Sequence, residues 1–152
     1  MTLNPRGPRY VLDTSVALKW FVSSGEGDSI RAQGLREAHV GKRCRLSAPE
    51  FMLLELANAL RTGRRFTSSE IIAILDALVA LDLALEALQQ STLAKAVELA
   101  TSFQTAVCDS YFLAMAMESG SMLVTADDRF ARDVGKHPNL RTLGDLRLPE
   151  PA

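Results

Sequence analysis

Acidic residues stand at four places where the surrounding sequence is apolar or where a predicted strand ends. Asp13 follows the first residues of "YVLDTSVALKWF", and Asp127 follows "SMLVTA". Glu55 lies inside "FMLLELANAL", and Asp109 lies inside "AVCDSYFLAMA". Burying a carboxylate without a partner costs several kcal/mol. These four residues are therefore candidates for a site at which another group compensates their charge.

Each carboxylate also has a purely structural interpretation. Asp13 suits the N-cap of the helix that follows it, as does one member of the pair Asp127 and Asp128. Asp109 suits a first helical turn, where the helix dipole favours an acid, and for this residue the two interpretations are balanced. Glu55 has no Lys or Arg three or four positions away. For Glu55 we favour burial with a partner over a solvent-facing position.

A divalent cation is the partner that the four acids favour. Carboxylates crowded together repel one another and raise their own pKa values. Mg²⁺ or Mn²⁺ relieves that repulsion and prefers carboxylate and water oxygens. Zinc-ligand spacing is absent, and His39 and His137 are expected at the surface. Cys44 and Cys108 are expected to be buried thiols in a reducing cytoplasm.

The elements that must position these residues alternate between strands and helices. Capping boxes at Ser47 with Glu50 and at Thr67 with Glu70 predict two helix starts, and Gly63 predicts the end of the first helix. Gly120 predicts the end of a later helix. Strands are predicted over 10–12, 44–46, 81–85, 122–125 and 141–143, and helices over 15–22, 30–39, 47–63, 67–78, 93–103 and 106–119.

This alternation predicts an α/β fold, a three-layer α/β/α sandwich around a mostly parallel sheet. In such sheets ligands bind beyond the carboxyl ends of the strands. Asp13 and Asp127 each follow a predicted strand, so both are expected at that edge. At 152 residues and 47% hydrophobic content, the chain is expected to form one domain over 1–152, with its core at about 10–143. Neither a membrane span nor a secretory signal is expected.

Charge is unevenly distributed along the chain. Residues 31–65 hold eight Lys and Arg against three Asp and Glu, whereas residues 66–128 hold one against nine. A basic segment beside an acidic one fits a polyanion next to a cation site, although solvated helix faces explain the same pattern. The basic residues that would follow a nucleic-acid backbone are Arg43, Arg45, Arg61, Arg64 and Arg65.

The segments around the four acids resemble those of a known family. "VLDTSVALKWF", "PEFMLLELANAL", "CDSYFLAMAMESG" and "LVTADDRF" are similar, in order, to the acidic motifs of PIN-domain ribonucleases, particularly the VapC-like toxins of type II toxin–antitoxin pairs. The similarity runs from about residue 10 to about residue 143. It implies a PIN-like sandwich, a Mg²⁺- or Mn²⁺-dependent endoribonuclease acting on RNA in the cytoplasm, frequent homodimers and a cognate antitoxin.

Carried over by residue, the resemblance places Asp13, Glu55, Asp109 and Asp127 on the acidic quartet that binds the metal. Ser15 matches a small hydroxyl residue beside the first Asp, and Asn58 matches an amide one turn after the Glu. With Thr125, these two are expected to orient the ligands. The chain departs from the family at two positions: Asp128 directly follows Asp127, which leaves its contact with metal open, and Cys108 stands where an aromatic residue is common.

Other classes of protein fit less well. A receiver domain would have adjacent acids near its first strand and a Lys after a late strand, and neither is present. A haloacid-type phosphatase would have a second Asp where Ser15 stands. The alternative from a different class is a PIN-fold module that binds RNA or a protein without cutting. The intact quartet favours the nuclease.

Overall fold

The structure is a computed structural model that describes residues 7–22, 27–63, 65–148 and 150. Its strands and helices alternate along the chain as the sequence predicts. The strands are β1 (Arg9–Leu12), β2 (Arg45–Pro49), β3 (Ala84–Glu86), β4 (Met122–Thr125) and β5 (Leu140–Thr142). The helices are α1 (Thr14–Phe21), α2 (Gly27–Val40), α3 (Phe51–Thr62), α4 (Ser68–Ala80), α5 (Gln90–Phe103), α6 (Val107–Ser119), α7 (Asp128–Val134) and the 3₁₀ turn η1 (Leu143–Asp145).

The strands form one sheet in the order β3-β2-β1-β4-β5, and every pairing in it is parallel. The central strand β1 pairs with β2 and with β4, with Leu12 opposite Val124. Residues 10–12 are all buried, which explains their uninterrupted apolar run, because a central parallel strand is covered on both faces. The predicted mostly parallel sheet is confirmed.

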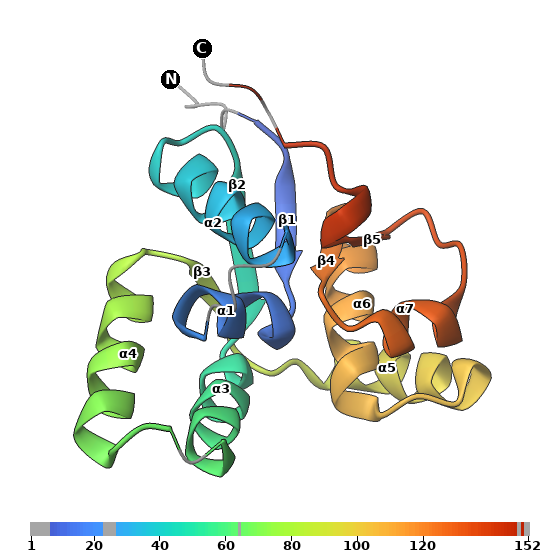
Figure 1. Ribbon diagram of the computed structural model, residues 1–152. Coiled ribbons are helices and arrows are strands. Elements are labelled where there is room, and N and C mark those ends of the chain that lie inside the picture. Colours follow the sequence, from blue (N-terminus) through green and yellow to red (C-terminus); the bar gives the residue numbers. More distant parts are fainter. Residues whose placement is uncertain (1–6, 23–26, 64, 149, 151–152) are drawn as a thin grey trace.

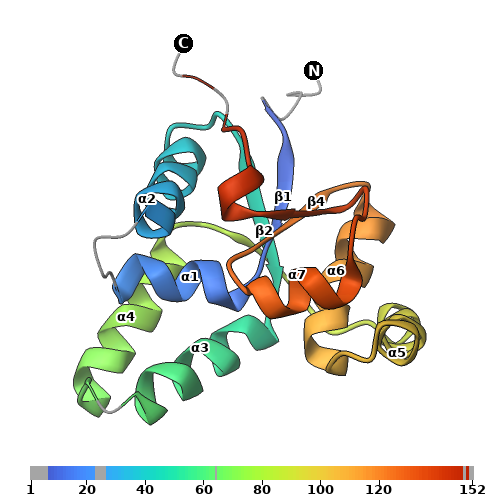
Figure 2. The same cartoon turned by 45° about the vertical axis from the view of Figure 1, so that its right-hand side comes forward.

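Helices cover both faces of this sheet. Figures 1 and 2 show α1 and α2 on one side and α6, backed by α5, on the other. Helix α6 runs against β1, β2 and β4, and residues 110–116 are buried all round it. Helices α3 and α4 pack against each other beyond the ends of β2 and β3 (Figure 1). The predicted three-layer α/β/α architecture is confirmed.

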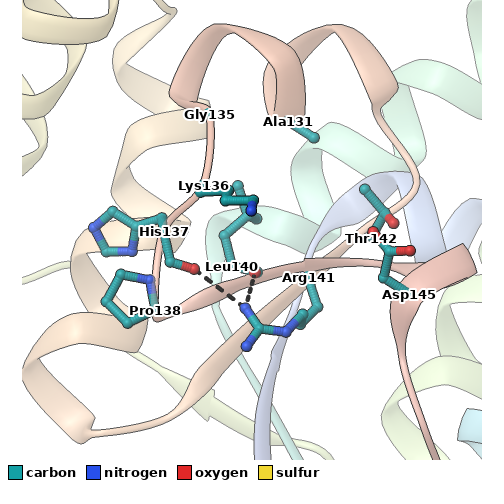
Figure 3. A pocket seen from close by; sticks show the side chains of 9 residues that line it. All are labelled: Ala131, Gly135, Lys136, His137, Pro138, Leu140, Arg141, Thr142 and Asp145. Atoms are coloured by element: carbon teal, nitrogen blue, oxygen red, sulfur yellow. Dashed lines mark hydrogen bonds between the residues drawn. The ribbon is translucent and has the colours of Figure 1, made fainter.

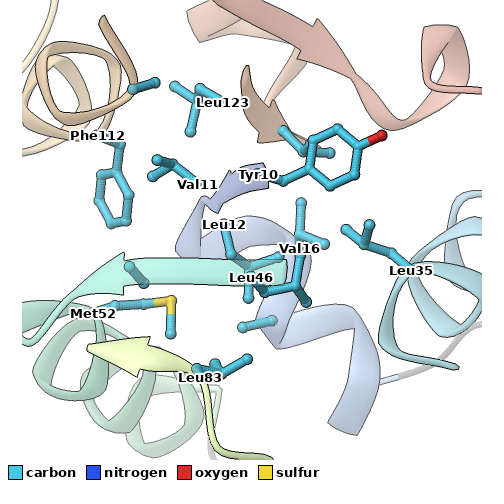
Figure 4. Close-up of a cluster of buried hydrophobic side chains, with 14 of the residues drawn as sticks. Tyr10, Val11, Leu12, Val16, Leu35, Leu46, Met52, Leu83, Phe112 and Leu123 are labelled. Atoms are coloured by element: carbon cyan, nitrogen blue, oxygen red, sulfur yellow. The ribbon is translucent and has the colours of Figure 1, made fainter. Parts of the chain in front are cut away.

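The hydrophobic core lies between the sheet and its helices (Figure 4). Val11, Leu46 and Leu123 come from three neighbouring strands, and none of them is exposed. Phe112 of α6 fills one side of the sheet. Trp20 is buried, and its Nε1–H donates to the Ala32 carbonyl at 2.7 Å. This bond holds α1 against α2.

One of the two predicted capping boxes is wrong. Residues 47–49 belong to β2, the Ser47 hydroxyl donates to the Tyr10 carbonyl at 3.4 Å, and α3 begins only at Phe51. The pairing of β2 with β1 and β3 therefore overrides the local helix signal. The second box is confirmed, since Thr67 accepts from the Glu70 N–H and Glu70 accepts from the Thr67 N–H.

Other boundaries differ from the predictions by a few residues. Helix α2 starts at Gly27 rather than near 30, α5 starts at Gln90 rather than 93, and β3 starts at Ala84 rather than 81. Gly63 and Gly120 end their helices as predicted, and Gly120 adopts a φ of 63°, which favours glycine. Among the described residues, no helix is both long and apolar enough to cross a membrane.

Candidate active site at the carboxyl edge of the sheet

Asp13 lies where β1 ends and α1 begins. Its N–H donates to the Val124 carbonyl at 3.1 Å, which continues the sheet by one residue. Its side chain is 7% exposed, and Oδ2 accepts from the hydroxyl and N–H of Ser15 and from the Thr125 hydroxyl at 3.1 Å. Asp13 is the N-cap of α1, as its structural interpretation required. It also keeps its second oxygen, Oδ1, free of hydrogen bonds from the described residues.

Ser15 and Thr125 connect the end of β1 to the end of β4. The Ala126 N–H donates to the Ser15 hydroxyl oxygen at 2.9 Å, and the Asp127 N–H donates to Thr125 Oγ1 at 3.0 Å. Each hydroxyl therefore donates to Asp13 while it accepts from the chain that leads to Asp127. This arrangement fixes the spacing between two strands' carboxyl ends.

Asp127 turns the chain from β4 into α7. Its Oδ1 accepts from the Phe130 N–H at 3.1 Å, which makes it the N-cap of that helix. Asp128 lies in the first turn of α7 and is exposed. The structure thus assigns the cap to the first of the two adjacent acids, and Asp127 Oδ2 stays without a hydrogen bond from the described residues.

Glu55 reaches the same region from α3. The Thr14 hydroxyl donates to Glu55 Oε1 at 2.8 Å, and the side chain is half-buried, as we expected for a Glu with a partner. Sequence reasoning missed Thr14, although its position as a hydroxyl residue directly after Asp13 was an available signal. Asn58, one turn further along α3, is exposed.

Aromatic packing fixes α3 against α6. The Phe51 ring meets Tyr111 and Phe112 edge-on, with centroids 5.1 and 5.3 Å apart. Phe51 lies one turn before Glu55, and Asp109 lies in the first turn of α6, just before Tyr111. The contact therefore brings Glu55 and Asp109 toward the same edge of the sheet.

The pKa values show that the four carboxylates lie close together. Burial raises the pKa of Asp109 to about 6, with further increases from the charges of Asp13, Asp127 and Glu55. Burial also raises the pKa of Asp13, against hydrogen bonds from Ser15 and Thr125, and Asp127 adds to the increase. Burial and the charge of Asp13 raise the pKa of Glu55, while the Thr14 hydroxyl lowers it. The predicted mutual repulsion is therefore present.

Open space lies beside two of these acids, Asp109 and Asp127. A pocket of about 310 Å³ is bounded by the loop before α6 and by α7. Asp13, Glu55 and Asp127 each use one oxygen in hydrogen bonds, and Ser29 Oγ is the only buried, unbonded side-chain polar atom in the described ranges. The remaining carboxylate oxygens are thus reachable from solvent. The pocket is lined by Gln104, Thr105, Ala106, Asp109, Asp127, Arg129, Phe130 and Asp133.

The fit to a metal ion rests on the donor set. All four acids offer oxygen, the ligand that Mg²⁺ and Mn²⁺ prefer. The described residues contain no group of three or more His, Cys, Asp or Glu side chains already assembled around one point. Mg²⁺ usually keeps several of its waters and binds through one or two carboxylates, so it does not need such a cage. The residues therefore fit a hydrated hard cation and do not fit zinc.

Several other predicted residues lie away from the site. Arg43 and Arg45 lie at the amino end of β2, the opposite edge of the sheet from Asp13, while Arg61 and Arg65 lie at the far end of α3. Arg64 falls outside the described residues. The basic segment is thus split between two regions.

The predicted surface position of the two histidines is only partly correct, and the predicted burial of Cys108 is wrong. Both histidines are half-buried rather than on the surface, and His39 links Leu46 N–H at 3.2 Å to the Leu81 carbonyl at 2.8 Å. Cys44 is buried, and burial raises the pKa of its thiol to about 11. Cys108 is exposed, because it faces outward from the first turn of α6.

Comparisons with known proteins agree with this arrangement. The model of the PIN domain family matches residues 10–134. No curated protein matches the chain in sequence. Among solved structures, the VapBC2 complex of Rickettsia felis with promoter DNA superposes with a TM-score of 0.64 at 16% identity, covering 88% of this chain and 98% of that one.

Two further structures show the same likeness. A toxin–antitoxin complex from Klebsiella pneumoniae gives a TM-score of 0.64 at 17% identity, over 90% of this chain and 99% of that one. The sarcin-ricin-loop-cleaving toxin VapC20 of Mycobacterium tuberculosis gives 0.62 at 16% identity, over 81% and 93%. These likenesses establish a shared fold, and the family match, which spans all four acids, establishes more: the chain belongs to the PIN domain family.

Proposed function

We propose that this protein is a divalent-metal-dependent endoribonuclease and the toxin of a toxin–antitoxin pair. The observation that carries the proposal is the convergence of Asp13, Glu55, Asp109 and Asp127, from four separate elements, at the carboxyl edge of the sheet. The raised pKa values of Asp13, Glu55 and Asp109 mean that, without a cation, burial and mutual repulsion disfavour their charged forms. Such an arrangement is typical of a site built for function.

Each acid has a role that follows from its contacts. Asp13, Asp109 and Asp127 would hold a Mg²⁺ or Mn²⁺ ion, directly or through water. When bound, the cation neutralises charge on the phosphate and lowers the pKa of a coordinated water. Ser15 and Thr125 hold Asp13 in one orientation through Oδ2, which leaves Oδ1 without a hydrogen bond from the described residues.

Glu55 is the group that we expect to take the proton of the attacking water. Thr14 fixes Oε1 and leaves Oε2 free, so the base has one defined orientation. Burial raises the pKa of Glu55 above its ordinary value, which makes its carboxylate a better proton acceptor. Asn58 and Asp128, both exposed, would contact the substrate or outer waters rather than the ion itself.

An antitoxin partner is supported by the relatives and by the surface. Two of the structural relatives are toxin–antitoxin complexes. Helices α3 and α4 expose large apolar side chains, with Leu54 at 74%, Ile72 at 59% and Val79 at 56%. Exposed apolar groups gathered on adjoining elements mark protein-binding surfaces. An antitoxin, or the second copy of a homodimer, would cover them.

The test is cleavage of labelled single-stranded RNA by antitoxin-free protein, with Mg²⁺ or Mn²⁺ and with chelator. Asp13→Asn removes one charge and little volume, and we expect it to abolish cutting while leaving the fold intact. Asp76→Asn, which removes an exposed acid on α4 away from the site, is the control and should retain activity. Cutting by Asp13→Asn at the wild-type rate would refute the assignment.

The non-catalytic interaction module is the second candidate. The observation in its favour is that no three of the acids are already assembled as a cage in the described residues. It would replace the nuclease if the wild-type protein neither cut RNA nor bound Mn²⁺. Binding of Mn²⁺ without cutting of a general RNA would instead indicate a narrow choice of substrate.

A further inference from the structure

A second, larger pocket lies outside the carboxylate site (Figure 3). It has a volume of about 600 Å³ and is formed by the end of α7, the loop that follows, β5 and η1. Its two cationic side chains, Lys136 and Arg141, are set against a single carboxylate, Asp145. The remaining lining residues are Ala131, Gly135, His137, Pro138, Leu140 and Thr142.

The Arg141 guanidinium is held in one position by the chain around it. One of its terminal nitrogens, Nη1, donates to the Leu140 carbonyl at 2.7 Å and to the His137 carbonyl at 3.2 Å (Figure 3). Both bonds use the same nitrogen, so the N–H groups on Nε and the other Nη remain available. A guanidinium fixed in this way loses little side-chain entropy when it binds an oxyanion through its free N–H groups.

Lys136 adds a second positive charge to the pocket. Figure 3 shows its side chain directed into the space between α7 and Arg141. Within the described part of the chain, neither Lys136 nor Arg141 forms an ion pair, and Asp145 therefore neutralises neither of them directly. Two unpaired cations at one concave surface create a positive potential that favours an anion.

Helix α7 connects this pocket to the carboxylates. Asp127 caps its start, Gly135 ends it, and at 1.5 Å per residue the two are about 12 Å apart. At the 3.4 Å rise of a stacked strand, that distance spans about three nucleotides. Arg129, in the first turn of α7, lines the pocket that contains Asp109 and Asp127. Helix α7 carries Arg129 and Arg132 together with Asp128 and Asp133, so the two cations of the second pocket are the nearest positive charges on this path that outnumber the acids around them.

We propose that the pocket of Lys136 and Arg141 binds a backbone phosphate of the RNA strand, about three nucleotides from the bond held at the carboxylates. This inference rests on the proposed function, because it names how the same substrate is held. The carboxylates repel an RNA backbone except where a cation is bound, so strand binding needs positive groups at a distance from them. The two cations supply this attraction, and α7 sets their distance from the acids.

The experiment measures binding of labelled single-stranded RNA in chelator, so that no cleavage occurs, at a series of salt concentrations. Lys136→Gln, Arg141→Gln and Arg141→Lys are compared with Lys42→Gln, which removes an exposed cation beside β2, on the other half of the sheet. The Lys136 side chain makes no hydrogen bond with the described residues, so Lys136→Gln tests the charge without removing a contact of the loop.

We expect Lys136→Gln to weaken RNA binding several-fold and to reduce the slope of log K against log salt by about 0.7, the value for one phosphate contact on a single strand. The variant that removes both cations should bind at least tenfold more weakly, and Arg141→Lys should fall between the wild type and Arg141→Gln. Lys42→Gln should leave both quantities unchanged.

Three other results would overturn the inference. If the wild type binds and cuts RNA and the pocket variants match it, the pocket is not part of the RNA path and the proposed function stands. If the wild type binds no RNA and cuts none, the pocket and the proposed function fail together. If inorganic phosphate raises the Tm of the wild type but not of Arg141→Gln, while RNA binding is unchanged, the pocket serves a free anion.

Discussion

At the scale of single residues, the acids divide their oxygens between the protein and the open space beside them. Asp13, Glu55 and Asp127 each give one oxygen to a hydrogen bond from the chain and leave the other free. The bonded oxygen fixes the carboxylate's orientation, and the other oxygen has no hydrogen bond from the described residues. The helix-cap interpretation and the metal-ligand interpretation of Asp13 and Asp127 are therefore compatible, since a helix cap needs only one carboxylate oxygen.

Asp109 provides the first prediction, because its pKa of about 6 exceeds its ordinary value of 3.8. A raised carboxyl pKa destabilises the folded state fully at pH values above about 6; the penalty declines between about 6 and 4 and disappears below that, where the group is protonated in both states. Asp109→Asn should therefore stabilise the metal-free protein by about 1 kcal/mol at pH 7.5, after solvent screening, and raise its Tm by about 2–4 °C.

Thermal unfolding in chelator at pH 7.5 and pH 4.5 measures this effect. The gain should shrink at the lower pH, because little penalty remains there to be removed. Asp76→Asn, on the exposed face of α4, is the control and should change the Tm little at either pH. A loss of stability in Asp109→Asn at pH 7.5 would contradict the electrostatic account.

Thr125 provides the second prediction. Thr125→Val keeps the shape of the side chain but removes the donor to Asp13 and leaves the Asp127 N–H without its acceptor. Such a loss at a buried site should lower the free energy of unfolding by about 1–3 kcal/mol. Chemical denaturation measures it against Thr101→Val, where an exposed hydroxyl bonds only to a carbonyl of its own helix. Equal losses at the two positions would show that the hydrogen bonds connecting β1 to β4 add nothing to the free energy of unfolding.

At the scale of the elements, strand ends and helix starts position the site. The two capping boxes give the third prediction. Thr67→Ala should cost about 1 kcal/mol of unfolding free energy, because a genuine N-cap is lost. Ser47→Ala should cost less, because Ser47 lies in β2 and its hydroxyl makes one bond of 3.4 Å. Chemical denaturation of the two variants measures both losses of unfolding free energy. A larger loss for Ser47→Ala than for Thr67→Ala would contradict the prediction.

The elements also show which features could be predicted from the sequence. Buried strands such as β1 and the turn chemistry at Gly63, Thr67 and Gly120 leave local signals, and these predictions are confirmed. Ser47 carried a local helix signal that lost to pairing with neighbouring strands, which no short window contains.

The acids of the candidate site could also be picked out from the sequence as candidates. Asp13, Glu55, Asp109 and Asp127 stand out because a carboxylate is unusual in an apolar segment. The contacts that support these acids could not be predicted in the same way. The Thr14–Glu55 bond joins residues 41 positions apart, and the Phe51 contact with Tyr111 joins residues 60 apart, so both depend on the finished fold. Sequence spacing alone does not reveal such contacts.

At the scale of the whole molecule, the proposed metal site would link stability to metal through the charge at the carboxyl edge. A ligand that binds only the folded state adds RT ln(1 + [L]/Kd), about 2.7 kcal/mol at one hundred times Kd. We therefore expect Mg²⁺ or Mn²⁺ to raise the Tm of the wild type in a saturable way, with no comparable effect from NaCl at equal ionic strength. Asp13→Asn should lose most of this increase.

The same linkage gives the gain in stability a defined pH dependence. A cation competes with the proton on Asp109, so its affinity should fall as pH is lowered through about 6, and the metal-induced rise in Tm should fall with it. Differential scanning calorimetry at pH 7.5, 6.5 and 5.5, with and without the ion, measures both trends. A rise in Tm that is the same at all three pH values, or that survives in Asp13→Asn, would place the ion elsewhere on the molecule. A rise that is lost both at pH 5.5 and in Asp13→Asn would instead tie the ion to the edge where the four elements converge, because burial and neighbouring acids raise the pKa of Asp109 to about 6 there.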